Sequence, residues 1–275
     1  MSKIIFQTIT CICLITVSHL NSWSLNEIAA DTSETISGWF TKEQKKTSSK
    51  EYPVKPECAI TVTNHTGSIS ITTWNKPTLM VEATKRGSEQ DINHAKFTVT
   101  VNDEDATVTI NSESRISTKK SVAIDYALIV PQKASLIIRT ELGNISTQET
   151  HGNLDLQTLS GSISIEQSSK TVHAKTPNGS ITAEQRTVSA DASIFLDAEY
   201  DITLIMPENA NARISASTIQ GKINSDIFIT LDPLTTTLNK DAYKRMQQQI
   251  WGTTGAGGPP ITLESTRGTI QIIGS

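Results

Sequence analysis

Aromatic residues are scarce in this sequence: they make up 5% of its 275 residues, and charged residues contribute only 19%. Ser, Thr, Ile and Val recur instead, a composition typical of short β-strands with polar outer faces. A helical bundle is therefore disfavoured, and the length fits one large all-β domain.

A basic surface is also missing. The formal net charge is −4 and the isoelectric point is about 5.8. Because proteins that bind nucleic acid concentrate Lys and Arg on one face, no nucleic-acid partner is expected.

Long apolar runs are confined to the N-terminus. A run from Ile4 to Val17 follows Lys3, and Ser22-Trp23-Ser24 then places small residues at the positions that a signal peptidase prefers, which predicts a signal peptide at residues 1–24. The run is shorter than the ~20 residues that span a bilayer, so a membrane would be reached only through an uncleaved N-terminus. Two of the three cysteines lie inside it, and processing would leave Cys58 without a disulfide partner. We expect export to the periplasm, the cell envelope or the extracellular space, and the pattern does not choose among them.

Residues 25–55 are mostly polar and show no sustained apolar period. Lysines are scattered among Ser, Thr and Glu, as in linkers that lack a packed core. We predict a disordered polar linker here, followed by a single domain at residues 56–275.

An internal repeat built on Gly-x-Ile begins near residue 56. Three residues before each glycine stands Asn, Thr or Ser, whose side chains cap turns, and the positions five and seven residues before it are apolar. The corner glycines are Gly67, Gly143, Gly161, Gly179, Gly221 and Gly268.

Each repeat thus consists of an alternating strand, a polar corner that ends in Gly, and a second alternating strand, as in Ser162–Ile165. A period of two buries one face of each strand. We expect the glycines to be required because they adopt positive φ, with the preceding hydroxyls bonded within the turn. Stacked corners would bury a core that no single repeat buries alone. The prediction is a β-solenoid, a right-handed β-helix-like roll of short strands with Thr/Ser-x-x-Gly-x-Ile corners, and the alternative is a β-sandwich.

Two features modify this pattern. Tyr126–Pro131 recurs as Tyr200–Pro207, and each proline is expected to end its strand. An insertion at residues 234–260 interrupts the repeat, with a short helix predicted at Asp241–Trp251 and a Gly-rich loop after it.

The corners resemble those of the bacterial putative-adhesin, or toastrack, family of extracytoplasmic β-helical domains. The most specific segment is Gly255–Ile270, where a Gly-rich loop leads into the last Ser-x-x-Gly-x-Ile corner. The resemblance covers about Glu57 to Ser275. It implies an exported scaffold without assigned catalysis, with adhesion or envelope-stress sensing as suggested roles.

Motifs for catalysis, metals or cofactors are weak. The histidines lack the helical spacing of a zinc site, although His151 could meet His173 across stacked coils. The segment Leu159–Ile163 lacks the first glycine of the Gly-x-Ser-x-Gly nucleophile elbow. Residues 252–258 are Gly-rich, but Pro259-Pro260 prevents a phosphate-binding helix from starting after them. The candidates for glycosidic chemistry qualify only by being acidic, and they are Asp155, Glu166, Glu184 and Asp191.

We therefore predict an exported, non-catalytic cell-envelope scaffold or adhesin-like binding domain with no metal and no cofactor. The expected partner is an envelope protein or a glycan, bound through exposed strand faces and the insertion. Two alternatives remain: an envelope-stress sensory domain, which needs a tether or a partner, and a carbohydrate-active β-helix enzyme, which needs a charged groove.

Overall fold

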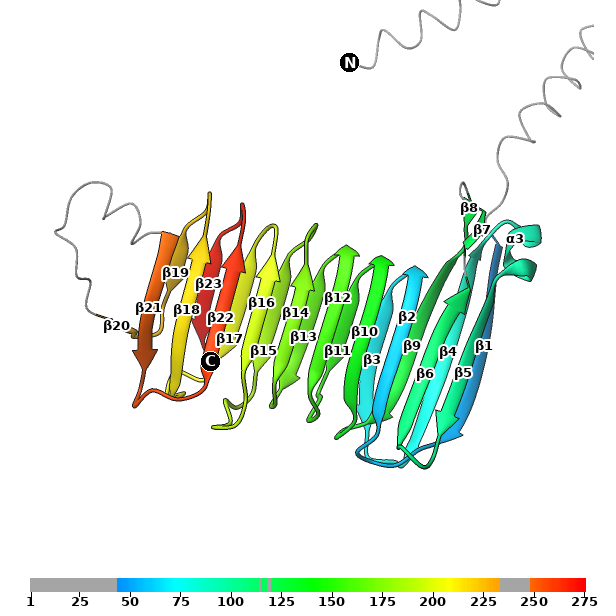
Figure 1. Ribbon diagram of the computed structural model, residues 1–275, viewed down its shortest axis with the longest axis horizontal. Coiled ribbons are helices and arrows are strands. Elements are labelled where there is room, and N and C mark those ends of the chain that lie inside the picture. The colour runs from blue at the N-terminus through cyan, green and yellow to red at the C-terminus, as the bar shows by residue number, and fades with distance from the viewer. Residues whose placement is uncertain (1–43, 114, 118–119, 233–247) are drawn as a thin grey trace, which may run out of the picture. The chain divides into compact units, whose positions relative to one another are not determined.

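Two large sheets take up most of the residues that the computed structural model describes, which are 44–113, 115–117, 120–232 and 248–275. They lie face to face within one unit, Gln44–Ser275 (Figure 1). In spatial order, the ten strands of sheet A are β1 (Gln44–Pro53), β4 (Thr78–Gly87), β9 (Ala123–Pro131), β3 (Ile69–Trp74), β11 (Ile145–Gln148), β13 (Ile163–Ser168), β15 (Ile181–Gln185), β17 (Ile202–Met206), β23 (Ile270–Gly274) and β19 (Ile223–Ser225). The eleven strands of sheet B are β20 (Thr230–Leu231), β21 (Gln249–Thr254), β18 (Ala212–Thr218), β22 (Pro260–Ser265), β16 (Ile194–Ala198), β14 (Val172–Thr176), β12 (Leu154–Ser160), β10 (Ser135–Leu142), β2 (Ala59–Thr66), β6 (Thr107–Glu113) and β5 (Lys96–Asn102).

Each repeat contributes one strand to each sheet, so that a strand pair and its corner make one coil. In β10–β11, β12–β13 and β14–β15, the first strand belongs to sheet B and the second to sheet A. Successive coils pair in parallel within both sheets. The β-solenoid prediction is therefore confirmed, and the sandwich alternative, which needs antiparallel pairing of neighbouring strands, is not.

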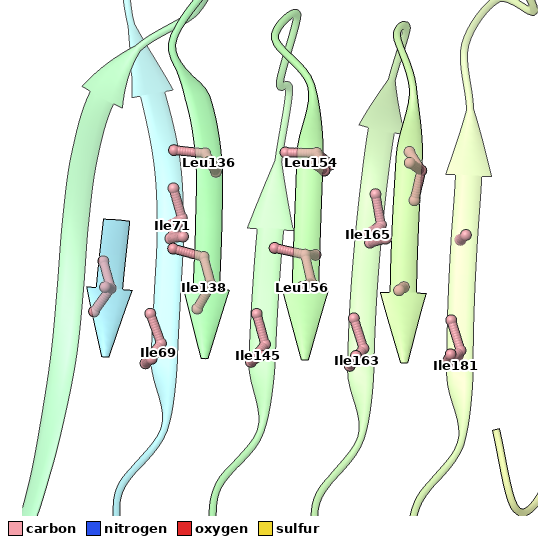
Figure 2. Packing of buried hydrophobic residues seen from close by; sticks show 14 of the residues in the cluster. Ile69, Ile71, Leu136, Ile138, Ile145, Leu154, Leu156, Ile163, Ile165 and Ile181 are labelled. Carbon is pink, nitrogen blue, oxygen red and sulfur yellow. The ribbon is translucent and has the colours of Figure 1, made fainter. Parts of the chain in front are cut away.

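The core consists of straight rows of aliphatic side chains, one from each coil (Figure 2). In sheet A, Ile69, Ile145 and Ile163 occupy the same rung, followed along the stack by Ile181 and Ile202. In sheet B, Leu136 lies beside Leu154 in the same way. Because these side chains are 2% exposed or less, each contributes about 1.5–3 kcal/mol of burial.

The coils do not stack in chain order at either end. The coil β2–β3 lies between β6–β9 and β10–β11, because β2 pairs with both β6 and β10, and β3 pairs with both β9 and β11. At the other end, β22–β23 lies between β16–β17 and β18–β19. The last coil in the chain, β22–β23, therefore lies between two coils that precede it in the sequence.

Antiparallel strands flank the parallel coils at both ends. In sheet A, β4 pairs with β9 and β1 pairs with β4, whereas in sheet B, β5 pairs with β6 and β21 pairs with β18. The linker prediction is therefore wrong for residues 44–53, which form β1. The prediction of a short helix at Asp241–Trp251 is wrong in part too, because residues 249–254 form the strand β21.

The remaining described elements are small. β7 (Arg115–Ser117) and β8 (Lys120–Ser121) form a hairpin. The helix α3 (Glu89–His94), which the sequence pattern did not reveal, begins at Ser88, whose Oγ accepts a hydrogen bond from the Asp91 N–H at 3.2 Å. The strand ends predicted at Pro131 and Pro207 are present in β9 and β17.

Within the described ranges, no helix has the length and apolarity needed to cross a membrane. The predicted signal peptide, most of the linker and residues 234–247 of the insertion lie outside the described residues.

Candidate functional site

The corner glycines form a column along the edge where sheet B turns into sheet A. A Cβ added to Gly143 would lie 2.1 Å from the Gly67 carbonyl oxygen, and one added to Gly179 would lie 1.9 Å from that of Gly161. Any side chain would therefore push neighbouring coils apart. Positive φ is found at Gly67, Gly143 and Gly161 alone among the six. The expectation of positive φ is wrong for Gly179, Gly221 and Gly268, where close stacking explains the glycine.

Two residues without a Gly-x-Ile signal also belong to this column. A Cβ on Gly67 would meet the Ile124 carbonyl oxygen at 2.2 Å, and one on Gly268 would meet the Tyr200 carbonyl carbon at 2.0 Å. The aspartate that follows each of them accepts a hydrogen bond from the next coil, Asp125 from the Ser68 N–H and Asp201 from the Thr269 N–H. The sequence signal is that residues 125–131 match residues 201–207 without a gap. The predicted duplication instead paired Tyr126 with Tyr200, so its start was shifted by two residues.

For five of the six glycines, the polar residue three positions earlier bonds between coils, and the exception is Thr140. Oγ1 of Thr158 donates to the Gly143 carbonyl at 2.8 Å, and the Asn64 amide donates to the Ile124 carbonyl at 2.8 Å. The expectation that these side chains bond within their own turn therefore describes only part of their hydrogen bonding. Folding alone explains the recurring glycines and polar side chains of this corner edge, so candidate binding surfaces lie elsewhere.

A polar groove of about 810 Å³ runs along the opposite edge, where sheet A returns to sheet B. We call it the return-edge groove. Its lining includes Lys133, His151, Asn153, Lys170 and Asp191, which come from the loops of four successive coils.

Two ion pairs lie in this groove. Lys133 Nζ is 3.3 Å from Glu57 Oε1, and Lys170 Nζ is 3.3 Å from Asp191 Oδ2. A hydrogen bond from its own backbone N–H, with a smaller contribution from Lys170, lowers the pKa of the Asp191 carboxyl. Each of the two acids thus lies beside a lysine of opposite charge.

A second hollow of about 400 Å³ adjoins the groove, and Thr187 lines both. Its other lining residues include Val188, Pro207 and Pro259. The loop between β15 and β16 thus stands between two recesses.

The outer face of sheet B carries a linked set of side chains. Asp155 accepts hydrogen bonds from Arg139 and from Nδ1 of His173, the latter at 2.9 Å, and the His173 ring lies 5.1 Å from that of Phe195. Burial raises the pKa of Asp155, but the hydrogen bonds from Arg139 and His173 outweigh it, and the net shift is downward.

The structure separates the predicted candidates. His151 lines the return-edge groove, whereas His173 pairs with Asp155 on the face of sheet B. Glu166 and Glu184 belong to strands of sheet A. Across the part of the chain that the structure describes, no group of three or more His, Cys, Asp or Glu side chains could hold a metal ion.

Sequence reasoning did not find the groove, because its residues lie in five separate loops that share no motif. The nearest signal was the 18-residue spacing of the corners, which also brings the return loops into line.

Comparison with solved structures finds a putative cell adhesion protein from Clostridium sporogenes ATCC 15579, with 14% identity, a TM-score of 0.46, and coverage of 84% of this chain and 100% of that one. A putative adhesin from Bacteroides fragilis NCTC 9343 has 13% identity, a TM-score of 0.40, and coverage of 84% and 98%. A putative lipid binding protein from Parabacteroides distasonis ATCC 8503 has 12% identity, a TM-score of 0.21, and coverage of 83% and 97%.

No curated protein matches the chain significantly. The family model described as Toastrack DUF4097 matches residues 134–273, just over half of the sequence. This range contains the corners at Gly143, Gly161, Gly179, Gly221 and Gly268 and starts later than the resemblance predicted from about residue 57. The chain belongs to the Toastrack DUF4097 family.

Proposed function

We propose that this chain is an exported, non-catalytic binding scaffold of the bacterial cell envelope, which contacts its partner through its polar outer surfaces. The observation that carries the proposal is a row of small hydroxyl side chains on five neighbouring strands of sheet A. The row consists of Ser70, Ser146, Ser164, Thr182 and Thr203. Because neighbouring strands are about 4.8 Å apart, it repeats one contact at a fixed spacing. Such a surface suits a shallow, multivalent partner.

The positions of the acidic residues support binding rather than hydrolysis. Glycosidic cleavage uses two carboxyl groups that flank one bond. Asp155 lies on the outer face of sheet B and is held by Arg139 and His173, whereas Asp191 lines the return-edge groove and pairs with Lys170. Each carboxylate therefore has a structural partner of opposite charge.

The N-terminal pattern supports export, since Lys3, the apolar run and the small residues Ser22 and Ser24 have the order of a signal peptide. The single cysteine outside that segment, Cys58, is buried, and burial raises the pKa of its thiol. The residues that the structure describes thus form no disulfide, and their fold suits either an oxidising or a reducing compartment.

The test is co-sedimentation of the purified full chain with isolated bacterial envelopes. We expect saturable retention that unlabelled chain competes away. A triple variant, Ser146→Arg, Ser164→Arg and Thr182→Arg, places three bulky charges on the row and should weaken retention at least tenfold. The matched control carries three arginines on exposed threonines of sheet B, at Thr63, Thr98 and Thr100. Absence of saturable retention of the native chain at any concentration would contradict the proposal.

A further inference from the structure

The return-edge groove has a rigid floor. The His151 N–H donates to the Gln132 carbonyl at 2.8 Å, and the Leu154 N–H donates to the Thr171 carbonyl at 2.9 Å. A Cβ on Gly152 would lie 2.0 Å from the Ala134 carbonyl oxygen, so adjacent return loops are in direct contact. The backbone of this floor is therefore held in place before any ligand arrives, which lowers the entropic cost of binding.

One wall of the groove is the long loop between β15 and β16. Oγ of Ser189 donates to the Ser169 carbonyl at 3.2 Å, and Asp191 pairs with Lys170 across the coil boundary. Within the loop, the Ala192 N–H donates to the Ser189 carbonyl at 3.0 Å. The wall is thus bonded to the neighbouring coil.

The side chains that line the groove are all polar or charged. Apart from Gly152, the side chains that line the groove are hydroxyls, one amide, one imidazole and charged groups, with no aliphatic and no Phe, Tyr or Trp side chain. Protein partners are anchored mainly by aromatic and other large side chains in desolvated pockets, and this groove offers none. Hydroxyl and amide groups both donate and accept hydrogen bonds, which matches a ligand rich in hydroxyl groups.

The charges in the groove favour a neutral ligand. Lys133 and Lys170 are offset by Glu57 and Asp191, each pair at 3.3 Å. Each pair presents donors and acceptors side by side, so one sugar hydroxyl can accept from the lysine and donate to the carboxylate. An anionic polymer would meet both acids at close range.

We infer that the return-edge groove binds a neutral oligosaccharide chain lying across the return loops of four coils. Three spacings of about 4.8 Å give the groove a length of about 14 Å, and its volume of about 810 Å³ lies within the range of ligand sites. A short run of sugar rings fits these dimensions. The inference rests on the proposed binding function and adds to it a second site, separate from the row on sheet A, with its own ligand class.

The test is calorimetric titration of the full chain with three neutral probes: cellotetraose, maltotetraose and tetra-N-acetylchitotetraose. At least one is expected to bind with a millimolar or lower dissociation constant. The groove variant Asn153→Ala/Lys170→Ala should weaken that binding at least tenfold, because it removes an amide and an ammonium group from the lining. The matched control is Asn224→Ala/Lys222→Ala, which removes the same two groups from exposed positions at the far end of sheet A and should change binding less than twofold.

Binding of none of the probes to the native chain overturns the inference. Equal binding by the native chain and the groove variant overturns it too, provided that circular dichroism shows the same melting temperature for both. In either case, saturable retention on envelopes would leave the proposed scaffold function standing. Loss of both retention and oligosaccharide binding would contradict the two proposals together.

Discussion

Oγ1 of Thr176 donates a hydrogen bond to the carbonyl oxygen of Gly161, one coil away, at 2.7 Å. The bond is one rung of a ladder along the corner edge, in which a hydroxyl from one coil reaches the glycine position of the next. Thr140 occupies the same place in its coil, yet its Oγ1 has no partner among the described residues. There the Asn64 amide donates to the Gly67 carbonyl at 3.2 Å.

These two threonines give a matched pair of substitutions. Thr176→Val removes a buried hydroxyl that is bonded and leaves the Gly161 carbonyl without its donor, so we expect a loss of about 1–3 kcal/mol in the free energy of unfolding. Thr140→Val removes a hydroxyl that lacks a partner and should be neutral within about 0.5 kcal/mol or stabilising. Urea unfolding of both variants measures the difference, and equal losses would contradict the ladder.

The glycine column predicts a large effect from one methyl group. Gly161→Ala would place a Cβ 2.2 Å from the Gly143 carbonyl oxygen, and we expect a loss of about 2 kcal/mol or more. Gly87→Ala is the control, because its Cβ would have no neighbour closer than 3.6 Å, and it should change stability by less than about 0.5 kcal/mol. A Gly161→Ala variant with the native melting temperature would show that the coils are not stacked this closely.

The lowered pKa of Asp155 predicts how the stability of the fold depends on pH. Its pKa is lowered in the folded chain from the usual 3.8, so it stabilises the fold above that value and the contribution disappears as the pH falls through the folded pKa. Its side chain is 36% exposed, so solvent screening limits the contribution to less than about 1 kcal/mol. Asp155→Asn should therefore lower the melting temperature at pH 7 more than at pH 2.5. The same loss at both pH values would assign the effect to packing instead.

We predict that two lysines of the edge strand β1 prevent self-association of the chain. Lys50 is paired with Val81, and Lys46 with Lys85, so both lysines point to the face that is buried in β4. Charges that point inward on an edge strand block pairing with another chain. Lys46→Val/Lys50→Val should increase the sedimentation coefficient with concentration, whereas Lys46→Gln/Lys50→Gln should do so less. A valine variant that sediments like the native chain would contradict this role.

The insertion needs a different experiment from the one that the sequence suggested. Deleting residues 234–260 would remove β21, which forms six residue pairs with β18, and Pro260 of β22. We therefore expect such a deletion to destabilise that end of the stack. Loss of binding in that variant would not locate a binding surface.

The corners and the core could be predicted from the sequence because they depend on local pattern. A period of two and a glycine at a fixed offset identify the inward positions, and Ile69, Ile145 and Ile163 do share one rung. Positive φ, the expected reason for the glycines, holds at Gly67, Gly143 and Gly161 only. The close contact between coils that all six share is invisible in a single repeat.

The stacking order could not be predicted, because every coil offers its neighbours the same aliphatic rung. Nothing in the pattern around Gly268 distinguishes pairing with the coil of Ile202 from pairing with that of Ile223, and the structure uses both. The return-edge groove was missed for another reason, because the loops that line it share no sequence motif. Strand β1 was missed because Gln44–Pro53 is almost entirely exposed, so its sequence carries no buried face.

The row on sheet A, the groove and the glycine column all depend on how the coils stack, and the end where β22–β23 is inserted is the most demanding case. The direct measurement is disulfide formation between paired cysteines on the outer face of sheet A. Thr203→Cys/Gln271→Cys joins residues in register on β17 and β23, and should crosslink readily, as mass spectrometry of the unreduced chain would show. Thr203→Cys/Asn224→Cys joins β17 to β19, two strands away, and should not. Crosslinking of the second pair and not the first would mean that the coils follow chain order, and would contradict the fold described here.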